Sequence, residues 1–147
     1  MIWLTRENID LSTIGLFSLT QIPWSLKFLW APIIDHYKIP FLHNYLGKRK
    51  SWLLITQFFL IISIILLGTN DPTSELFYTA FFALLVSFFS ATQDIIIDAY
   101  RIETLSESDQ GAGAAMTQAG YRVGGIIAGA GALYFREIMK WETVFIL

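Results

Sequence analysis

The stretch SWLLITQFFLIISIILL, residues 51–67, contains no charged side chain and decides the class of fold. A run of this length is near the lower limit for a helix that crosses the hydrocarbon core of a bilayer. Further apolar runs lie on both sides of it, at residues 13–34, 76–97 and 111–135, and an incomplete one begins at residue 141. The pattern predicts an all-α, polytopic membrane helix bundle that forms a single, partial transmembrane domain.

The composition supports a membrane protein. Of the 147 residues, 54% are apolar and 15% are charged, with a mean hydropathy of +0.54. A soluble domain has about 45–50% apolar and about 25% charged residues. A soluble bundle with unusually apolar helices is the alternative, but four runs of spanning length are hard to bury in so short a chain.

The charge balance and the cysteine content exclude several classes of function. Ten Lys and Arg against twelve Asp and Glu give a net charge of −2, so there is no basic surplus to meet the phosphates of nucleic acid. The chain has no cysteine, so it cannot form a disulfide or a Cys-ligated metal site. His36 and His43 lack metal-ligand spacing, and no nucleophile stands beside a base. We therefore expect no metal, no cofactor and no enzyme.

The loop charges predict the orientation of the chain in the membrane. Residues 35–50 carry Lys38, Lys48, Arg49 and Lys50, whereas residues 68–75 carry no Lys or Arg. Loops rich in Lys and Arg remain in the cytoplasm, so the first of these loops is expected inside and the second outside. Alternation then places the N-terminal segment outside. We expect a further helix upstream of Met1, and hence a chain truncated at both ends.

Ionisable residues inside the predicted spans are candidates for function. Lys27, Asp94, Asp98 and Arg122 each lie within or at the end of a span, where an unpaired charge costs at least about 2.5–3.5 kcal/mol. Arg122 is close to the middle of its span and is predicted to line a central pathway and meet an anionic substrate group. A carboxylate could carry a coupling proton, or Lys27 could pair with Asp94 or Asp98 to hold helices together.

Polar and small residues add weaker signals. Gln93, Gln118 and Tyr121 could line a substrate pathway or form hydrogen bonds between helices. Pro23 is expected to kink the first span because it removes a backbone hydrogen bond. The spacing of small residues on the fourth span predicts helix packing, on a surface that could also slide in a transporter, at Gly120, Gly124, Gly125 and Gly129.

Several motifs together resemble those of the AmpG muropeptide permeases of the major facilitator superfamily, which are related to the acetyl-CoA transporter group. They are LKFLWAP at 26–32 followed by Asp35, GKRKSWLL at 47–54, SATQDIIIDAY at 90–100, and GAGAA at 111–115 with GYR at 120–122. The blocks occur in the family's order over nearly the whole chain.

The resemblance implies a permease of the bacterial inner membrane that imports anhydromuropeptides by proton coupling, with an N-terminal segment in the periplasm. Its fold would consist of two six-helix halves, of which this chain resembles helices two to five and the start of six. The resemblance also implies a cytoplasmic gate motif at Asp35, Gly47, Lys48, Arg49 and Lys50.

The sequence departs from the family pattern in places. His36 and Gln110 stand where basic residues are common, residues 35–47 form a longer loop, and the C-terminal half of the permease is absent. A separately encoded remainder is therefore an expected partner, besides the lipid bilayer and a sugar–peptide substrate. The alternatives are another anionic or sugar-conjugate substrate on the same fold, and a non-transporting remnant that packs against other membrane helices.

Overall fold

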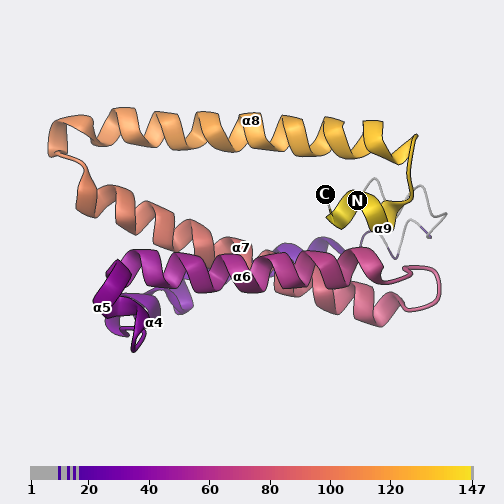
Figure 1. The fold of residues 1–147 in the computed structure, drawn as a ribbon, viewed down its shortest axis with the longest axis horizontal. Coiled ribbons are helices and arrows are strands. Elements are labelled where there is room, and N and C mark those ends of the chain that lie inside the picture. The colour runs from indigo at the N-terminus through magenta and orange to yellow at the C-terminus, as the bar shows by residue number, and fades with distance from the viewer. Residues whose placement is uncertain (1–9, 11–12, 14, 16, 147) are drawn as a thin grey trace.

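The computed structural model describes residues 10, 13, 15 and 17–146, and all of its regular secondary structure in that part is helical (Figure 1). The prediction of an all-α bundle is therefore confirmed. In chain order the elements are η1 (Ser18–Gln21), α3 (Ile22–Leu26), η2 (Lys27–Leu29), α4 (Ala31–His36), α5 (Leu42–Leu46), α6 (Lys48–Thr69), α7 (Leu76–Thr104), η3 (Glu107–Asp109), α8 (Gln110–Arg136) and α9 (Trp141–Ile146).

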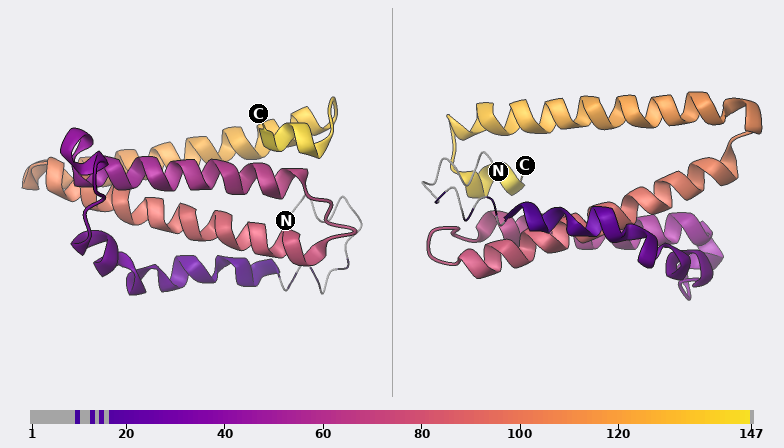
Figure 2. Two further views of the ribbon diagram at one scale, coloured as in Figure 1. Left: turned by 60° about the horizontal axis from the view of Figure 1, so that its bottom comes forward. Right: turned by 180° about the vertical axis from the view of Figure 1, so that it is seen from behind.

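Helix α7 is the centre of the arrangement. It packs along α6 on one side and along the run η1–α3–η2 on the other (Figure 2). Helix α8 is joined to α7 by the short turn around η3 and runs apart from the layer of α6 and α7, and α9 turns back from the end of α8 onto α6 (Figure 1). The run η1–α3–η2 and helix α6 therefore pack on α7 from two sides.

The long helices contain the predicted spans and extend beyond them. Helix α6 covers residues 51–67, α8 covers 111–135, and α7 covers 76–97 and continues to Thr104. In the described part of the chain, α6 and α7 are the two helices that are long and apolar enough to cross a membrane by length and composition. The four spans as drawn from the sequence, and the incomplete one from residue 141, remain predictions.

The segment 13–34 does not form one uninterrupted helix in its described part. It is divided into η1, α3, η2 and α4, and each of the two short α-helices has a proline in its first turn, Pro23 in α3 and Pro32 in α4. A proline fits the first turn because its missing N–H has no partner there. The expected kink at Pro23 is thus one of several interruptions.

Burial in α6 and on much of α7 is the reverse of that in a soluble protein. The buried residues of α6 are Ser51, Thr56, Ser63 and Gly68. Large apolar side chains point outward instead, with Phe58 62% exposed and Phe77 77% exposed. Exposed apolar surface on this scale is unfavourable in water, whereas small residues between helices and large ones facing lipid are usual in membrane bundles.

Glycines at two places on the long helices should respond differently to the same substitution. A Cβ at Gly68 would lie 2.8 Å from Cγ of Phe145, whereas a Cβ at Gly124 would meet nothing within 4 Å. Gly68→Ala should therefore separate α9 from α6 and lower the free energy of unfolding by about 1–3 kcal/mol. Gly124→Ala is the matched control, and should raise it by up to about 1 kcal/mol because alanine favours the helix. Unfolding in detergent followed by circular dichroism measures both, and equal changes would contradict the docking of α9.

Candidate functional site

One cluster of charges joins three elements at one end of the molecule. The guanidinium of Arg49, in the first turn of α6, donates from Nη1 to Oδ1 of Asp35 at 2.6 Å and from Nη2 to Oε1 of Glu103 at 2.5 Å. Its Nε also donates to Oε1 of Glu103, at 3.0 Å. Arg49 therefore links α4, α6 and α7 through one side chain, which is only 10% exposed.

The backbone around Gly47 sets up this cluster. Gly47 precedes α6 with φ of 79°, a left-handed conformation that side-chain-bearing residues rarely adopt. Lys48, the next residue, donates from Nζ to the main-chain oxygen of Asp35. Lys50 is exposed and has no hydrogen bond or ion pair with the described residues. The structure thus brings Asp35, Lys48 and Arg49 together as a unit, and leaves Lys50 outside it.

Electrostatics agree with this geometry. The hydrogen bond from Arg49 lowers the pKa of Glu103 below its usual 4.5, and the hydrogen bond to Glu103 raises the pKa of Arg49 above its usual value, with Asp35 contributing less. Both groups are thus held in their charged forms. Glu103 was not among the predicted gate residues, although alternation of the spans places residues 101–110 on the same side as the loop 35–50.

A second ion pair lies between the broken first segment and α7. Nζ of Lys27 is 2.5 Å from Oδ2 of Asp94, and each side chain is 34% exposed. The ammonium also lies over the ring of Trp24, 5.4 Å from its centroid, and Nε1 of Trp30 donates to Oγ1 of Thr92 at 3.1 Å. Of the two carboxylates that the sequence offered to Lys27, the structure pairs it with Asp94.

The other polar residues near the end of α7 have separate surroundings. Asp98 accepts from Nη2 of Arg101 at 3.2 Å, within its own helix. Arg101 also reaches the side chain of Gln110 at 3.3 Å, and so joins α7 to the start of α8. Oε1 of Gln93 is buried and has no hydrogen-bond partner among the described residues. Asp98 and Gln93 therefore do not join the Lys27–Asp94 pair.

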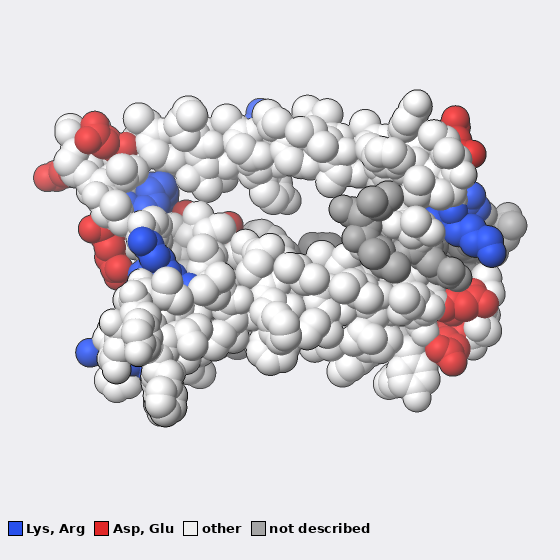
Figure 3. All heavy atoms as spheres, in the orientation of Figure 1, with Lys and Arg blue, Asp and Glu red and all other residues white. Residues whose placement is uncertain are grey.

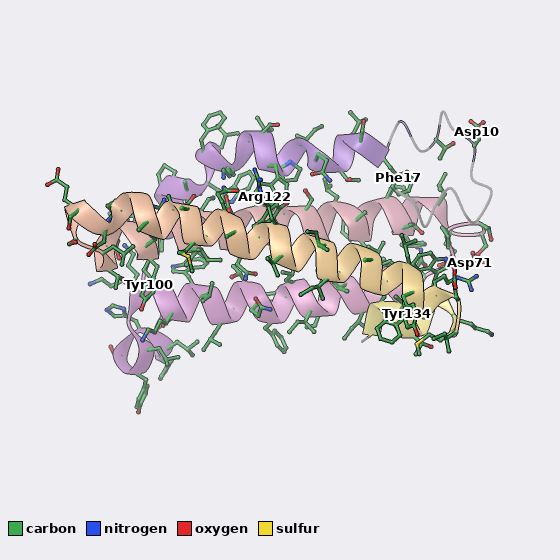
Figure 4. All side chains as sticks on the ribbon, turned by 90° about the horizontal axis from the view of Figure 1, so that it is seen from above. Asp10, Phe17, Asp71, Tyr100, Arg122 and Tyr134 are labelled. Carbon is green, nitrogen blue, oxygen red and sulfur yellow. The ribbon has the colours of Figure 1, made fainter. Side chains whose placement is uncertain are left out.

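The candidates on α8 are exposed in this structure. Arg122 lies near the middle of the helix (Figure 4), and Gln118 and Tyr121 are also exposed. A Cβ built at any of Gly120, Gly124, Gly125 or Gly129 meets nothing within 4 Å. The predicted helix packing at these glycines has no partner in the described part of the chain, and so it remains a prediction.

A cavity of about 480 Å³ lies next to the Lys27–Asp94 pair. It is bounded by η1 and α3, by one face of α7, and by single residues of α6, α8 and α9. The residues that line it are Phe17, Thr20, Gln21, Trp24, Leu67, Thr79, Ala83, Val86, Ser87, Ser90, Tyr121 and Phe145. Figure 3 shows an opening between α8 and the layer below it, and charged side chains gathered mainly at the two ends of the molecule.

The cavity and the Lys27–Asp94 pair lie next to each other, both along α3 and η2 and along α7. Ser90 precedes Asp94 by one helical turn of α7, and Trp24, which lines the cavity, contacts the ammonium of Lys27. A charged pair at the end of an uncharged, partly polar cavity inside an apolar helical layer can hold a solute with an ionic group and a neutral polar part. No group of three or more His, Cys, Asp or Glu in the described residues could hold a metal ion.

Comparisons with known proteins place the chain among homologues of membrane transporters. Residues 3–78, about half of the chain, match the sequence profile of the family described as acetyl-coenzyme A transporter 1. The anhydromuropeptide permease of Escherichia coli K12 is 42% identical over 139 residues, which are 95% of this chain and 27% of that permease. An uncharacterized protein of Haemophilus influenzae is 42% identical over 145 residues, 99% of this chain and 33% of that protein. The chain spans about a third of the length of these relatives.

The homology places the chain in the class of membrane transporters of the major facilitator superfamily, which are not enzymes. The chain belongs to the family described as acetyl-coenzyme A transporter 1, and it is homologous to AmpG-type permeases. The resemblance drawn from its motifs is confirmed. Membership implies a lipid bilayer around the helices and a transported substrate.

Proposed function

We propose that this chain forms part of a proton-coupled permease of the bacterial inner membrane that imports anhydromuropeptides for cell-wall recycling. The observation that carries the proposal is the Lys27–Asp94 pair at the edge of a cavity among apolar helices, in a chain homologous to a permease of that substrate. Ionisable groups at membrane depth mark substrate and proton pathways. In the proposal the N-terminal segment is periplasmic; most of it lies outside the described residues.

Each charged residue has a role in this proposal. Asp94 carries the coupling proton, because protonation of its carboxylate releases the ammonium of Lys27. Arg122 binds an anionic group of the substrate, since no carboxylate in the described residues pairs with its exposed guanidinium. The cluster of Asp35, Lys48, Arg49 and Glu103 holds the cytoplasmic side closed. A separately encoded remainder of the permease supplies the other wall of the pathway.

Uptake measurements test the proposal. Cells that lack their own permease would express this chain together with the remaining two-thirds of a homologous permease as a second chain. We expect uptake of radiolabelled anhydromuropeptide, reduced at least about tenfold in Arg122→Ala, because a charge-assisted hydrogen bond to a ligand contributes about 1.5–3 kcal/mol. Arg122→Lys, which keeps the charge, should retain a larger share. Membrane levels of each variant, measured on blots, provide the control.

Two outcomes would change the proposal. Unchanged uptake in Arg122→Ala would contradict the proposal that Arg122 binds an anionic group of the substrate. Absence of uptake by the co-expressed chains favours the alternative of a non-transporting membrane protein, for which the open face at Gly120, Gly124, Gly125 and Gly129 is the supporting observation. Uptake of a different sugar conjugate or anion in place of the muropeptide would identify another substrate on the same fold.

A further inference from the structure

We propose that a groove between α6 and α7 binds an anionic phospholipid, with an acyl chain along the groove and the lipid phosphate on the ammonium of Lys50. The proposal depends neither on the transported substrate nor on transport itself, because it requires only the lipid bilayer around the helices. It gives a role to the one residue of the predicted gate motif GKRK that the charge cluster at Arg49 leaves outside.

The first observation is the wall of this α6–α7 groove. Its volume is about 380 Å³, within the usual range of roughly 300–1,000 Å³ for small-molecule sites. Leu54 is 52% exposed, so the groove opens on the surface of the described structure. An acyl chain that enters the groove buries apolar surface and leaves no polar group unpaired. The apolar residues of the wall are Leu46, Leu53, Leu54, Ile96 and Ile97.

The second observation is the order of the lining residues along the two helices. Helices α6 and α7 run antiparallel, because Arg49 in the first turn of α6 contacts Glu103 in the last turn of α7. Lys50 and Tyr100, which both line the groove, are therefore at about the same level. The apolar residues on both helices follow about one turn further along, which is about 5 Å. The groove thus has a polar end and an apolar length, in the order in which a phospholipid presents its phosphate and its chain.

The third observation is the level of Lys50 in the molecule. Charged side chains gather mainly at the two ends (Figure 3), and Lys50 lies at one of them, in the first turn of α6. Tyr100, which is 43% exposed, lies toward the same end (Figure 4). Tyrosine is enriched at the boundary between the hydrocarbon core and water. The ammonium of Lys50 is therefore at the level of the lipid phosphates, and the apolar wall is at the level of the acyl chains.

The local charge favours an anionic headgroup. Arg49 is paired with the carboxylates of Asp35 and Glu103, and Lys48 donates to a main-chain oxygen. Lys50 is exposed and forms no hydrogen bond or ion pair with the described residues. The residues that line the groove include no Asp or Glu. Three cations against two carboxylates leave a positive charge here, and the ammonium of Lys50 is free to donate to a phosphate.

Other occupants of the groove would use less of its chemistry. A zwitterionic lipid has chains for the apolar wall, but its headgroup carries an ammonium that Lys50 repels. An apolar helix from another chain would cover the ammonium of Lys50 and leave it without a counter-charge, which is costly in a membrane. A phospholipid with one net negative charge fits both the wall and the lysine.

Lipid binding to the full chain, purified in a neutral detergent, tests the proposal. Native mass spectrometry measures the dissociation constant of the first bound lipid, for dioleoylphosphatidylglycerol and for dioleoylphosphatidylcholine, which has the same chains and no net charge. We expect phosphatidylglycerol to bind at least about fivefold more tightly. Lys50→Gln should weaken its binding about fivefold, the attraction of one lysine for an anionic lipid surface, and should leave phosphatidylcholine unaffected.

Two pairs of variants separate the groove from general attraction. Lys38→Gln removes an exposed lysine of the preceding loop that does not line the groove, and should leave both affinities unchanged. Leu54→Gln should weaken phosphatidylglycerol binding about threefold or more, because it removes apolar contact. Leu66→Gln, at an exposed leucine of α6 outside the groove, should not weaken it. In detergent without phospholipid, Lys50→Gln should unfold like the unchanged chain, which separates binding from folding.

Three outcomes would overturn the proposal. Equal affinities of the unchanged chain for the two lipids would show that the headgroup charge is not recognised. Equal losses in Lys38→Gln and Lys50→Gln would show a diffuse attraction to the whole loop. Displacement of phosphatidylglycerol by an excess of glycerol 3-phosphate would show a site for a free phosphate group, to which the groove contributes nothing. Each of these results leaves the uptake proposal standing, because uptake is measured separately.

Discussion

Lys27→Met should lower the free energy of unfolding of the chain in mixed micelles by about 2–3 kcal/mol, because it leaves the Asp94 carboxylate without its ammonium partner. The loss is below that of a fully buried pair, since each side chain of the pair is 34% exposed. Asp94→Leu should lower the free energy of unfolding by a similar amount, because the ammonium of Lys27 is then unpaired. Titration with a denaturing detergent, followed by circular dichroism, measures each value.

Combining the two substitutions tests whether both losses of stability come from breaking the Lys27–Asp94 pair. Lys27→Met combined with Asp94→Leu removes both charges and should recover most of the stability, to within about 1 kcal/mol of the unchanged chain. Lys50→Met is the matched control, because this lysine is exposed, forms no hydrogen bond or ion pair with the described residues and should change the stability by less than about 0.5 kcal/mol. Additive losses in the double variant would show that the pair does not interact.

Arg49→Ala should lower the free energy of unfolding by about 1–2 kcal/mol. The substitution removes bonds to Asp35 and Glu103 together, but these acids are 53% and 54% exposed, and solvent weakens such pairs. Arg49→Lys keeps a charge but cannot donate to both carboxylates in the same fork geometry, so it should give an intermediate value. Lys50→Ala, one residue further on, is the control.

The pH dependence of the Arg49→Ala effect follows from Glu103. The pKa of this carboxyl is lowered in the folded chain by the hydrogen bond from Arg49. Its contribution to stability is therefore complete above the ordinary pKa of 4.5 and is lost as the pH falls through the lowered value. The difference between the unchanged chain and Arg49→Ala should thus be constant from pH 8 to about pH 5.5 and shrink below pH 4.5. A difference that stays constant down to pH 3 would contradict the bond.

The apolar runs predicted the helices well because long uncharged stretches have few other structures available to them. Helices α6, α7 and α8 each contain a predicted span, and the loop between α6 and α7, residues 70–75, contains Asn70 and Pro72, which favour a turn. The subdivision of residues 13–34 was only partly visible. Pro23 indicated a kink, but the complete break depends on how the short helices pack along α7.

The sequence reduced the possible partners of Lys27 to two carboxylates but could not select one of them. Asp94 and Asp98 lie on one face of a helix, so spacing alone offers both to Lys27. The choice of Asp94 depends on the position of η2 along α7, which no local pattern specifies. Arg49 with Glu103 was missed for the same reason, because these residues are far apart in the chain and meet only when α6 and α7 pack side by side.

The cavity could not be found from sequence. Gln21, Trp24 and Tyr121 were visible as polar or aromatic residues within apolar runs, but Ser87 is an ordinary residue for a membrane helix. Its place in the cavity wall comes from the packing of η1 and α3 against α7, which is a property of the folded geometry alone.

Helix α7 holds the two ion pairs at a set separation. Asp94 and Glu103 are nine positions apart, which is about 13 Å along the axis and two and a half turns, so their side chains leave opposite sides of the helix. One side meets Lys27 of η2 and the other meets Arg49 of α6. The number of residues between the two carboxylates, 95–102, is therefore fixed by the geometry. Inserting or deleting a single residue there would rotate one carboxylate by about 100° relative to the other and leave one partner unmatched.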